Sequence, residues 1–239
     1  MSFSICKGYL LTKVDYQIFD EIITFLTETG NLFTCLSRGT RKIASKNARN
    51  LIYFSLIEFE FFNSRQPNTM GKLMRAKRIE NEDSSKSYIS STVNNVSLLF
   101  INEIICNQKL SGLSVYNFYK TLMETKIEHD DNYVLVIYSL IKLVKILGWK
   151  ITLDKCAICS KKKIFNFSPK AYGFVCNDCN SEYFTTDKNV IKILFYVAES
   201  KYLNASNFDN KYKKMTIKVL MNYYYETLAI NLYSLLLVF

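Results

Sequence analysis

Four of the chain's seven cysteines lie between residues 156 and 179, as two Cys-x2-Cys pairs with 16 residues between them. Two cysteines three positions apart can direct both thiolates at one ion, and two such turns complete a tetrahedron. A set of four thiolates leaves no coordination position for a substrate, so the ion would be structural. The predicted ligands of one Zn²⁺ ion are Cys156, Cys159, Cys176 and Cys179, and another thiolate-bound metal such as iron is the alternative ion.

Disulfides and a redox centre are the alternative explanations of these pairs. The odd cysteine count, the lack of a signal-peptide layout and the lack of an uninterrupted bilayer-length apolar run favour a cytoplasmic protein with reduced thiols. A thioredoxin-like centre needs only one Cys-x2-Cys, whereas here two pairs flank a predicted hairpin at residues 164–175. Cys6, Cys35 and Cys106 lie in apolar surroundings and are predicted to be core residues.

The first 80 residues show the alternation of apolar and polar side chains that is typical of half-buried strands. Phe59 and Phe61, for example, alternate with Glu58 and Glu60. Five short antiparallel strands fit a small barrel, and an oligonucleotide-binding (OB) barrel is one solution, although periodicity alone fits an SH3-like barrel equally well. The predicted strands are residues 7–14, 21–28, 31–37, 56–61 and 69–80.

Beyond a polar stretch at residues 81–87 the apolar period becomes helical. The predicted helix 132–147 is apolar on most sides, and its polar stripe is Ser139, Lys142 and Lys145. Asp187 is placed to cap a later helix. The predicted fold class is α+β multidomain, an N-terminal five-stranded antiparallel OB-like β-barrel followed by an α-helical domain with an inserted four-cysteine zinc ribbon. The predicted boundaries are 1–80 for the barrel, 81–150 and 184–239 for the two parts of the helical domain, and 151–183 for the zinc module.

Little in the sequence supports catalysis. His129 is the only histidine, which removes most triads and histidine metal sites, and it lies in a predicted surface loop. The seven glycines are too scattered for a phosphate-binding loop or a dinucleotide fingerprint. The acidic pair Asp130 and Asp131 is interpreted as a helix start. We therefore predict that the protein is not an enzyme.

The formal net charge of +10 suits a polyanionic partner such as nucleic acid or an anionic membrane surface, although an AT-rich genome would also raise the lysine count. Placement favours nucleic acid, because five cations fall within twelve residues after the third predicted strand. The cations on the last predicted strand lie on both of its faces, so they cannot all line one groove. Some of them are expected only to prevent the edge of the sheet from pairing with another chain. A lysine group at residues 211–218 is interpreted as a solvated face. The predicted DNA-binding residues are Arg38, Arg41, Lys42, Lys46 and Arg49 in the loop, and Arg75, Lys77 and Arg78 on the strand.

Two segments resemble the RecO family of bacterial recombination mediators. The segment from Gly8 to Lys42 is similar to the family's opening strands, which end in a glycine followed by basic residues. The segment from Leu147-Gly-Trp to Cys179 is similar to the family's zinc segment, and the order of barrel, helices and zinc module also matches.

The resemblance implies a non-enzymatic factor in DNA repair and recombination after DNA damage. Such a factor binds single- and double-stranded DNA and anneals complementary strands. It also works with RecR and the C-terminal tail of single-strand-binding protein to load RecA, in the cytoplasm at the nucleoid and without a membrane. The alternatives are a zinc-ribbon RNA-binding or ribosome-associated factor, an adaptor that docks an acidic protein, and a thiol oxidoreductase.

Overall fold

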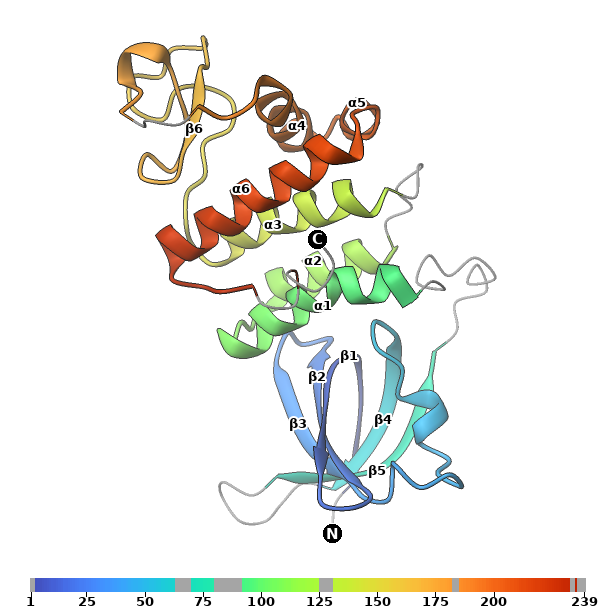
Figure 1. Ribbon diagram of the computed structural model, residues 1–239. Helices are drawn as coiled ribbons and strands as arrows, with labels where there is room; N and C mark the ends of the chain where they lie inside the picture. The colour runs from blue at the N-terminus through green and yellow to red at the C-terminus, as the bar shows by residue number, and fades with distance from the viewer. Residues whose placement is uncertain are drawn as a thin grey trace. The chain divides into compact units, whose positions relative to one another are not determined.

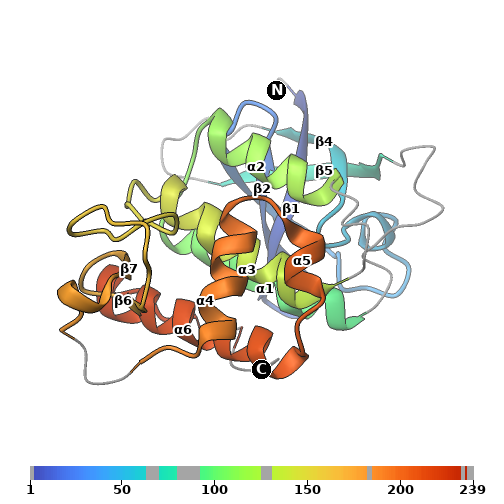
Figure 2. The same ribbon diagram turned by 90° about the horizontal axis from the view of Figure 1, so that it is seen from above.

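The computed structural model describes residues 3–62, 70–79, 92–124, 131–181, 185–232 and 235 (Figures 1 and 2). The chain divides into two compact units, residues 1–95 with 101–125, and residues 96–100 with 126–239. The predicted polar stretch at 81–87, His129 and Asp130 lie outside the described residues. None of the helices in the described ranges combines the length and the apolar character that a bilayer crossing demands.

The first unit contains a closed five-stranded β-barrel, as predicted (Figure 1). Around the barrel the order is β1-β2-β3-β5-β4, and β4 pairs back with β1. The strands of the structure overlap all five predicted ones and differ from them mainly at the ends. They are β1 (Phe3–Tyr16), β2 (Asp20–Thr27), β3 (Leu32–Ser37), β4 (Leu56–Phe62) and β5 (Gly71–Arg78).

One pair of neighbouring strands runs parallel, which corrects the expectation of a wholly antiparallel barrel. β3 and β5 pair in parallel, with Cys35 opposite Gly71 and Leu36 opposite Lys72. The other neighbours are antiparallel. A ring with an odd number of strands cannot alternate in direction all the way round, so at least one pair must point the same way. The parallel pair is therefore a consequence of closure and has no local signal in the sequence.

The barrel interior is filled by the alternate residues that a period of two predicts. Phe59 and Phe61 of β4 are buried, whereas Glu58 and Glu60 are half-exposed. Phe25 of β2 stacks on Phe59, with ring centroids 4.1 Å apart and ring planes 10° apart. Burying one such side chain contributes about 1.5–3 kcal/mol. A register slip of one residue would turn the whole set outward, so burial fixes the register.

Two helices complete the first unit, α1 (Thr92–Asn107) apart from its residues 96–100, and α2 (Leu113–Glu124). The ring of Tyr119 lies 5.1 Å from that of Tyr9 on β1, centroid to centroid. The Tyr119 hydroxyl donates to Oδ1 of Asn102 at 2.8 Å, and Nδ2 of Asn102 donates to the Leu11 carbonyl at 2.8 Å. This buried chain of hydrogen bonds joins both helices to the barrel, so the barrel folds with a helical cover.

A close approach of two glycines also joins α2 to the barrel. The N–H of Gly112, just before α2, donates to the carbonyl of Gly30 at 2.8 Å. Gly30 has a φ of +81°, and a Cβ atom there would lie 2.3 Å from the carbonyl carbon of Gly112. The contact therefore requires glycine at position 30 both for conformation and for space.

The second unit is mostly helical, with α3 (Asn132–Ile146), α4 (Lys188–Ala198), α5 (Tyr202–Ser206) and α6 (Asn210–Leu228). α3 packs along α6, and Figure 1 shows the two helices side by side. Asp131 caps α3 by accepting from the N–H groups of Tyr133 and Val134, which confirms the predicted helix start. Asp187 caps α4 by accepting from the N–H of Asn189 at 2.7 Å, also as predicted.

The predicted polar stripe of α3 is only partly exposed. Lys145 is exposed and Lys142 is half-buried, but Ser139 is completely buried. The Ser139 hydroxyl donates to the carbonyl of Leu135, one turn earlier, at 2.8 Å. Because that bond satisfies the hydroxyl within its own helix, the serine packs as a small core residue, which corrects the prediction.

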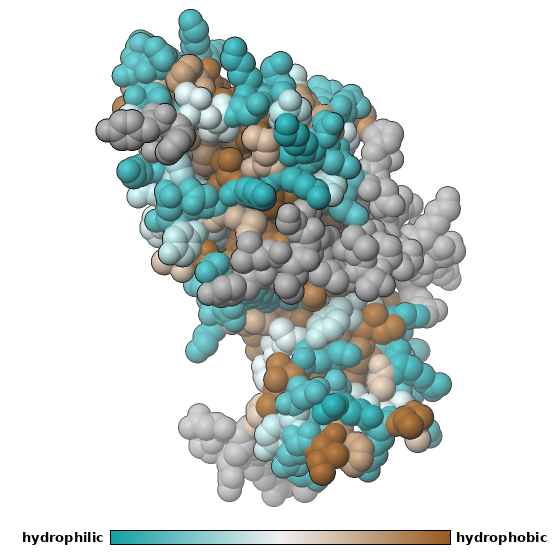
Figure 3. Space-filling model, viewed as in Figure 1, coloured by the Kyte–Doolittle hydropathy of each residue, from teal (hydrophilic) through white to brown (hydrophobic). Residues whose placement is uncertain are grey.

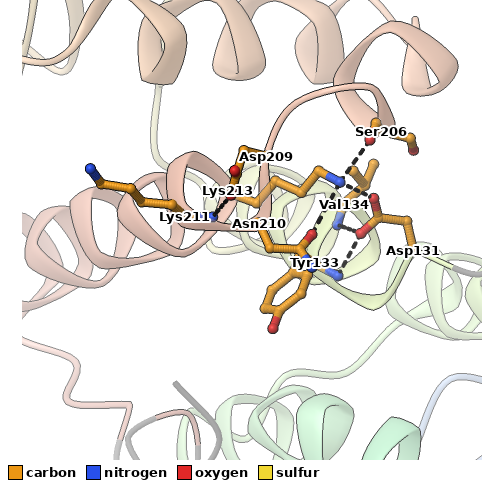
Figure 4. A network of polar contacts seen from close by, with 8 residues as sticks. All are labelled: Asp131, Tyr133, Val134, Ser206, Asp209, Asn210, Lys211 and Lys213. Carbon is orange, nitrogen blue, oxygen red and sulfur yellow. Dashed lines mark hydrogen bonds and ion pairs between the residues drawn. The ribbon is translucent and has the colours of Figure 1, made fainter.

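Lys213 of α6 is a buried cation, which corrects its interpretation as part of a solvated face. Its side chain is 5% exposed, and its Nζ atom lies 2.6 Å from Oδ2 of Asp131. Nζ also donates to the Ser206 carbonyl at 2.7 Å and to Oδ1 of Asn210 at 3.4 Å. Figure 4 shows these bonds converging on the ammonium group. Asp131 is thus both the cap of α3 and the counter-ion of α6, and it fixes the two helix starts together.

Gly30→Ala is expected to destabilise the protein much more than Gly148→Ala. The φ angles of the two glycines are almost equal, +81° and +82°, so a side chain at either position costs about 1–2 kcal/mol in backbone strain. Position 148 has open space, whereas position 30 does not. Thermal unfolding should therefore show a decrease in Tm several degrees larger for Gly30→Ala. Equal decreases would contradict the close approach.

Lys213→Met is expected to lower the free energy of unfolding by about 3–5 kcal/mol, because it leaves the carboxylate of Asp131 buried without a counter-ion. Lys211→Met is the matched control, since Lys211 is exposed on the same helix. Denaturant unfolding measures both, and adding Asp131→Asn to Lys213→Met should recover part of the loss. Similar losses for the two single variants would show that the buried pair has no special role.

Candidate metal centre and nucleic-acid interface

The two Cys-x2-Cys pairs meet at one point. The sulfur atoms of Cys156, Cys159, Cys176 and Cys179 all lie within 4.8 Å of one another, and those of Cys159 and Cys176 are 3.5 Å apart. A disulfide needs a distance of about 2.05 Å. Four Zn–S bonds of about 2.3 Å in a tetrahedron place the sulfurs about 3.8 Å apart. The cluster therefore has the dimensions of a metal site and not those of two disulfides.

A short hairpin brings the pairs together. It consists of β6 (Asn166–Ser168) and β7 (Gly173–Val175), inside the predicted 164–175 segment. The N–H of Ala157, between the first two cysteines, donates to the carbonyl of Phe174 on β7 at 2.7 Å. The second pair follows β7 directly and is closed by a 3₁₀ turn (Asn177–Cys179). The hairpin thus sets the distance between the two pairs.

The module is fixed to α6 by one aromatic side chain of the hairpin and by two hydroxyl groups of α6. The ring of Phe167 on β6 lies 5.9 Å from that of Tyr223, centroid to centroid, at 61°. The Tyr223 hydroxyl donates to the Lys150 carbonyl at 3.1 Å, and the hydroxyl of Thr227 donates to the Pro169 carbonyl at 3.4 Å. These contacts place the cysteine module on one side of α6 within the second unit.

The pKa values of Cys156 and Cys179 are shifted in opposite directions. Desolvation opposes ionisation of Cys156, but hydrogen bonds from backbone N–H groups, first that of Cys159, outweigh it and lower the pKa to about 6. The pKa of Cys179 is raised to about 12, chiefly because its thiol bonds to the sulfurs of Cys159 and Cys176. Four thiolates this close repel one another, so a cation is needed to hold all four in the ionised form.

The cysteines outside the cluster behave as core or half-buried residues. Cys35 is completely buried in the barrel, and burial raises its pKa to about 12. Cys106 is half-buried, and burial raises its pKa to about 11. Cys6 is half-buried and packs against the barrel core. At neutral pH Cys35 and Cys106 are protonated and therefore poor metal ligands.

The loop with the predicted DNA-binding cations begins at the end of β3 and is fixed to the β1–β2 turn. The N–H of Gly39 donates to Oδ1 of Asp20 at 2.8 Å, and the N–H of Arg41 donates to the Phe19 carbonyl at 3.0 Å. The Arg41 guanidinium lies 3.1 Å from the carboxylate of Asp15. The backbone of the loop is therefore held while its cations face solvent. The exposed loop cations are Arg38, Arg41, Lys42, Lys46 and Arg49.

The far end of the loop is fixed to β5 by two asparagines that the sequence analysis did not single out. Asn47 donates to the Met74 carbonyl at 3.2 Å and accepts from the N–H of Ala76 at 3.1 Å. Asn50 accepts from the N–H of Arg78 at 3.4 Å. The sequence gives no signal for these contacts, because the partner is backbone almost thirty residues away. They place the Lys46–Arg49 end of the loop beside the cations of β5.

Arg75 and Lys77 of β5 lie opposite acidic residues of β4, whereas of the five loop cations one, Arg41, forms an ion pair, with Asp15. In the β4–β5 register, Arg75 stands opposite Glu60 and Lys77 stands opposite Glu58. Opposite charges on paired strands attract, so part of this positive charge is offset within the barrel. Arg75 and Lys77 are exposed and Arg78 is half-exposed. The loop is thus the stronger of the two candidates for contact with phosphates.

Two family models match the chain. The model of the Recombination protein O N terminal matches residues 1–81, and that of the Recombination protein O C terminal matches residues 113–236, more than half of the chain. The chain belongs to the RecO family. This confirms the resemblance seen in the opening strands and the cysteine segment, and it identifies a DNA repair protein of that family.

Individual RecO proteins are similar over most of their length. DNA repair protein RecO of Mycoplasma mycoides is 30% identical over 185 residues, which are 74% of this chain and 71% of the relative. That of Mesoplasma florum is 26% identical over 238 residues, 96% and 88% of the two chains. That of Listeria welshimeri is 25% identical over 240 residues, 96% and 91%.

In this RecO-family chain, Cys179→Ser is expected to abolish stoichiometric metal binding and to lower Tm, because three sulfurs cannot complete the site. Cys106→Ser is the control and should keep the metal. Elemental analysis of the purified protein gives both the identity of the ion and its amount per chain. Protons compete for thiolates, so the ion should be released as the pH falls. Equal metal content in the two variants would contradict the site.

Proposed function

We propose that this RecO-family protein is a non-enzymatic DNA-binding recombination mediator. It binds single- and double-stranded DNA, anneals complementary strands, and promotes RecA loading together with RecR and single-strand-binding protein. Family membership supports the general role in DNA repair. The observation that carries the DNA-binding proposal is the loop of five exposed cations whose backbone is fixed at both ends to the barrel.

Annealing by this surface needs no chemical step. Two DNA backbones repel each other, and a cationic surface that holds both strands screens the repulsion and raises their local concentration. Base pairing can then nucleate by itself. Because the contacts are with phosphates, binding is largely independent of base sequence and depends steeply on salt. The proposed contact residues are Arg38, Arg41, Lys42, Lys46, Arg49, Arg75, Lys77 and Arg78.

The proposed ion of the cysteine cluster is one Zn²⁺. A closed set of four thiolates is typical of structural zinc, and it leaves no site for water or substrate. The ion would join the two cysteine turns and so hold the hairpin against α6. Its role in the mediator is therefore mechanical, and DNA contact through the metal is not required.

The partners follow from the same proposal. The tail of single-strand-binding protein is acidic, so it suits a basic partner, and we assign its groove to the helical part of the chain. RecR completes the complex that delivers RecA to coated single strands. Both interactions place the protein at the nucleoid in the cytoplasm.

The test is annealing of two complementary oligonucleotides coated with single-strand-binding protein, followed by fluorescence, with wild type and Arg41→Ala/Lys42→Ala. The double variant should anneal more slowly. The slope of log binding constant against log salt concentration on single strands should become shallower by about 1.4, because two phosphate contacts are lost. Lys188→Ala/Lys192→Ala is the matched control, since it removes two exposed lysines of α4.

The outcomes separate the candidate functions. Unchanged annealing and an unchanged salt slope in the loop variant would contradict DNA contact by the loop. A wild-type protein that binds RNA in preference to DNA, and that ignores single-strand-binding protein, would favour the RNA-binding alternative. A protein without affinity for either nucleic acid would favour an adaptor.

A further inference from the structure

The β1–β2 turn presents large apolar side chains to solvent beside the cationic loop. Ile18 is 77% exposed and Phe19 is 48% exposed, although both are apolar. Gln17, which begins the turn, has a φ of +53°, so the chain reverses within three residues and directs them away from the core. Figure 3 shows hydrophobic surface among hydrophilic residues on the barrel. A contiguous exposed apolar patch can mark a binding site.

An open hollow of about 810 Å³ lies between this turn and the start of the basic loop. Its lining combines an aromatic ring with two cationic side chains, those of Arg38 and Lys42. The ammonium group of Lys42 lies 5.4 Å from the centroid of the Phe19 ring. The complete lining is Gln17, Ile18, Phe19, Asp20, Arg38, Gly39 and Lys42.

The two walls of the hollow are fixed to each other. Oδ1 of Asp20, the acidic group in the lining, accepts from the N–H of Gly39 at 2.8 Å, so this carboxylate is committed to the backbone. The Phe19 carbonyl accepts from the N–H of Arg41 at 3.0 Å. A hollow with fixed walls is formed before a ligand arrives, and this lowers the cost of binding.

We propose that this hollow takes an unpaired base of single-stranded DNA, stacked against Phe19, with the adjoining phosphates held by Arg38 and Lys42. This proposal rests on the DNA-binding function proposed above. It assigns to Phe19 the discrimination of single-stranded from double-stranded DNA. A flat aromatic face beside cations matches the two parts of a nucleotide, its base and its phosphate. Bases in a duplex are stacked on each other and do not offer a free face to a side chain on the protein surface. Phe19 therefore adds affinity for single strands only, whereas the cations bind the phosphates of both single strands and duplexes.

Phe19→Ala tests the proposal, with binding of fluorescent oligo-dT and of a duplex of equal length measured by anisotropy. Affinity for the single strand should fall about tenfold, in line with the loss of one stacked base, and affinity for the duplex should change less than twofold. Phe19→Tyr should keep the affinity, because it keeps the aromatic face. Phe3→Ala is the matched control, since Phe3 is an exposed aromatic residue of β1, 62% exposed, outside the hollow.

A 2-aminopurine base in the oligonucleotide provides a second measurement. Stacking quenches its fluorescence, so wild type and Phe19→Tyr should quench it and Phe19→Ala should not. Equal loss of single-strand and duplex affinity in Phe19→Ala, or no loss of either, would overturn the stacking proposal. If Arg41→Ala/Lys42→Ala still weakened binding in that case, the proposed DNA-binding function would stand without the stacking residue. Failure of the wild type to bind either form would overturn both.

Discussion

Closure of the barrel depends on the short parallel pairing of β3 with β5. Because β5 occupies the place beside β3, the next strand along the chain, β4, must lie on the far side of β5. The chain therefore cannot leave β3 by a tight hairpin, and residues 38–55 have to pass the end of β5 before β4 begins. A connection of this length has room for a row of cations that no strand could present together. The basic loop is thus a product of the topology.

The same pairing leaves part of β5 without a strand neighbour, and the loop fills that place. β5 meets β3 only at Gly71 and Lys72, so its backbone beyond these residues would be an open edge on that side. Open edges invite pairing with other chains. The side-chain amides of Asn47 and Asn50 satisfy backbone groups of β5 from residue 74 to residue 78. One segment therefore protects the barrel edge and carries the proposed contacts to phosphate.

The fold was predictable from the sequence wherever the determining pattern is local. The alternation in β4, the cap at Asp187 and the spacing of the four cysteines each act over a few residues, and the structure has the strand, the helix start and the cluster that they indicate. Features set by distant partners were not predictable. From the sequence Lys213 is expected to be a surface lysine, because its counter-ion Asp131 lies 82 residues away in the chain. Ser139 was mispredicted for a different reason: its hydroxyl bonds to a carbonyl of its own helix, so the side chain can be buried although it is polar.

The boundary between the two family matches differs from the boundary between the two compact units, because α2 packs on the barrel. The C-terminal family match begins at residue 113, the first residue of α2, yet α2 lies in the compact unit of the barrel. Tyr116 and Tyr119 cover Tyr9, and the residue just before the C-terminal match, Gly112, donates a backbone hydrogen bond to Gly30 of the barrel. A chimera that exchanged barrels between relatives at the start of the C-terminal match would combine the barrel of one protein with the α2 helix of another. A chimera joined after α2 would keep each barrel with its own α2 helix.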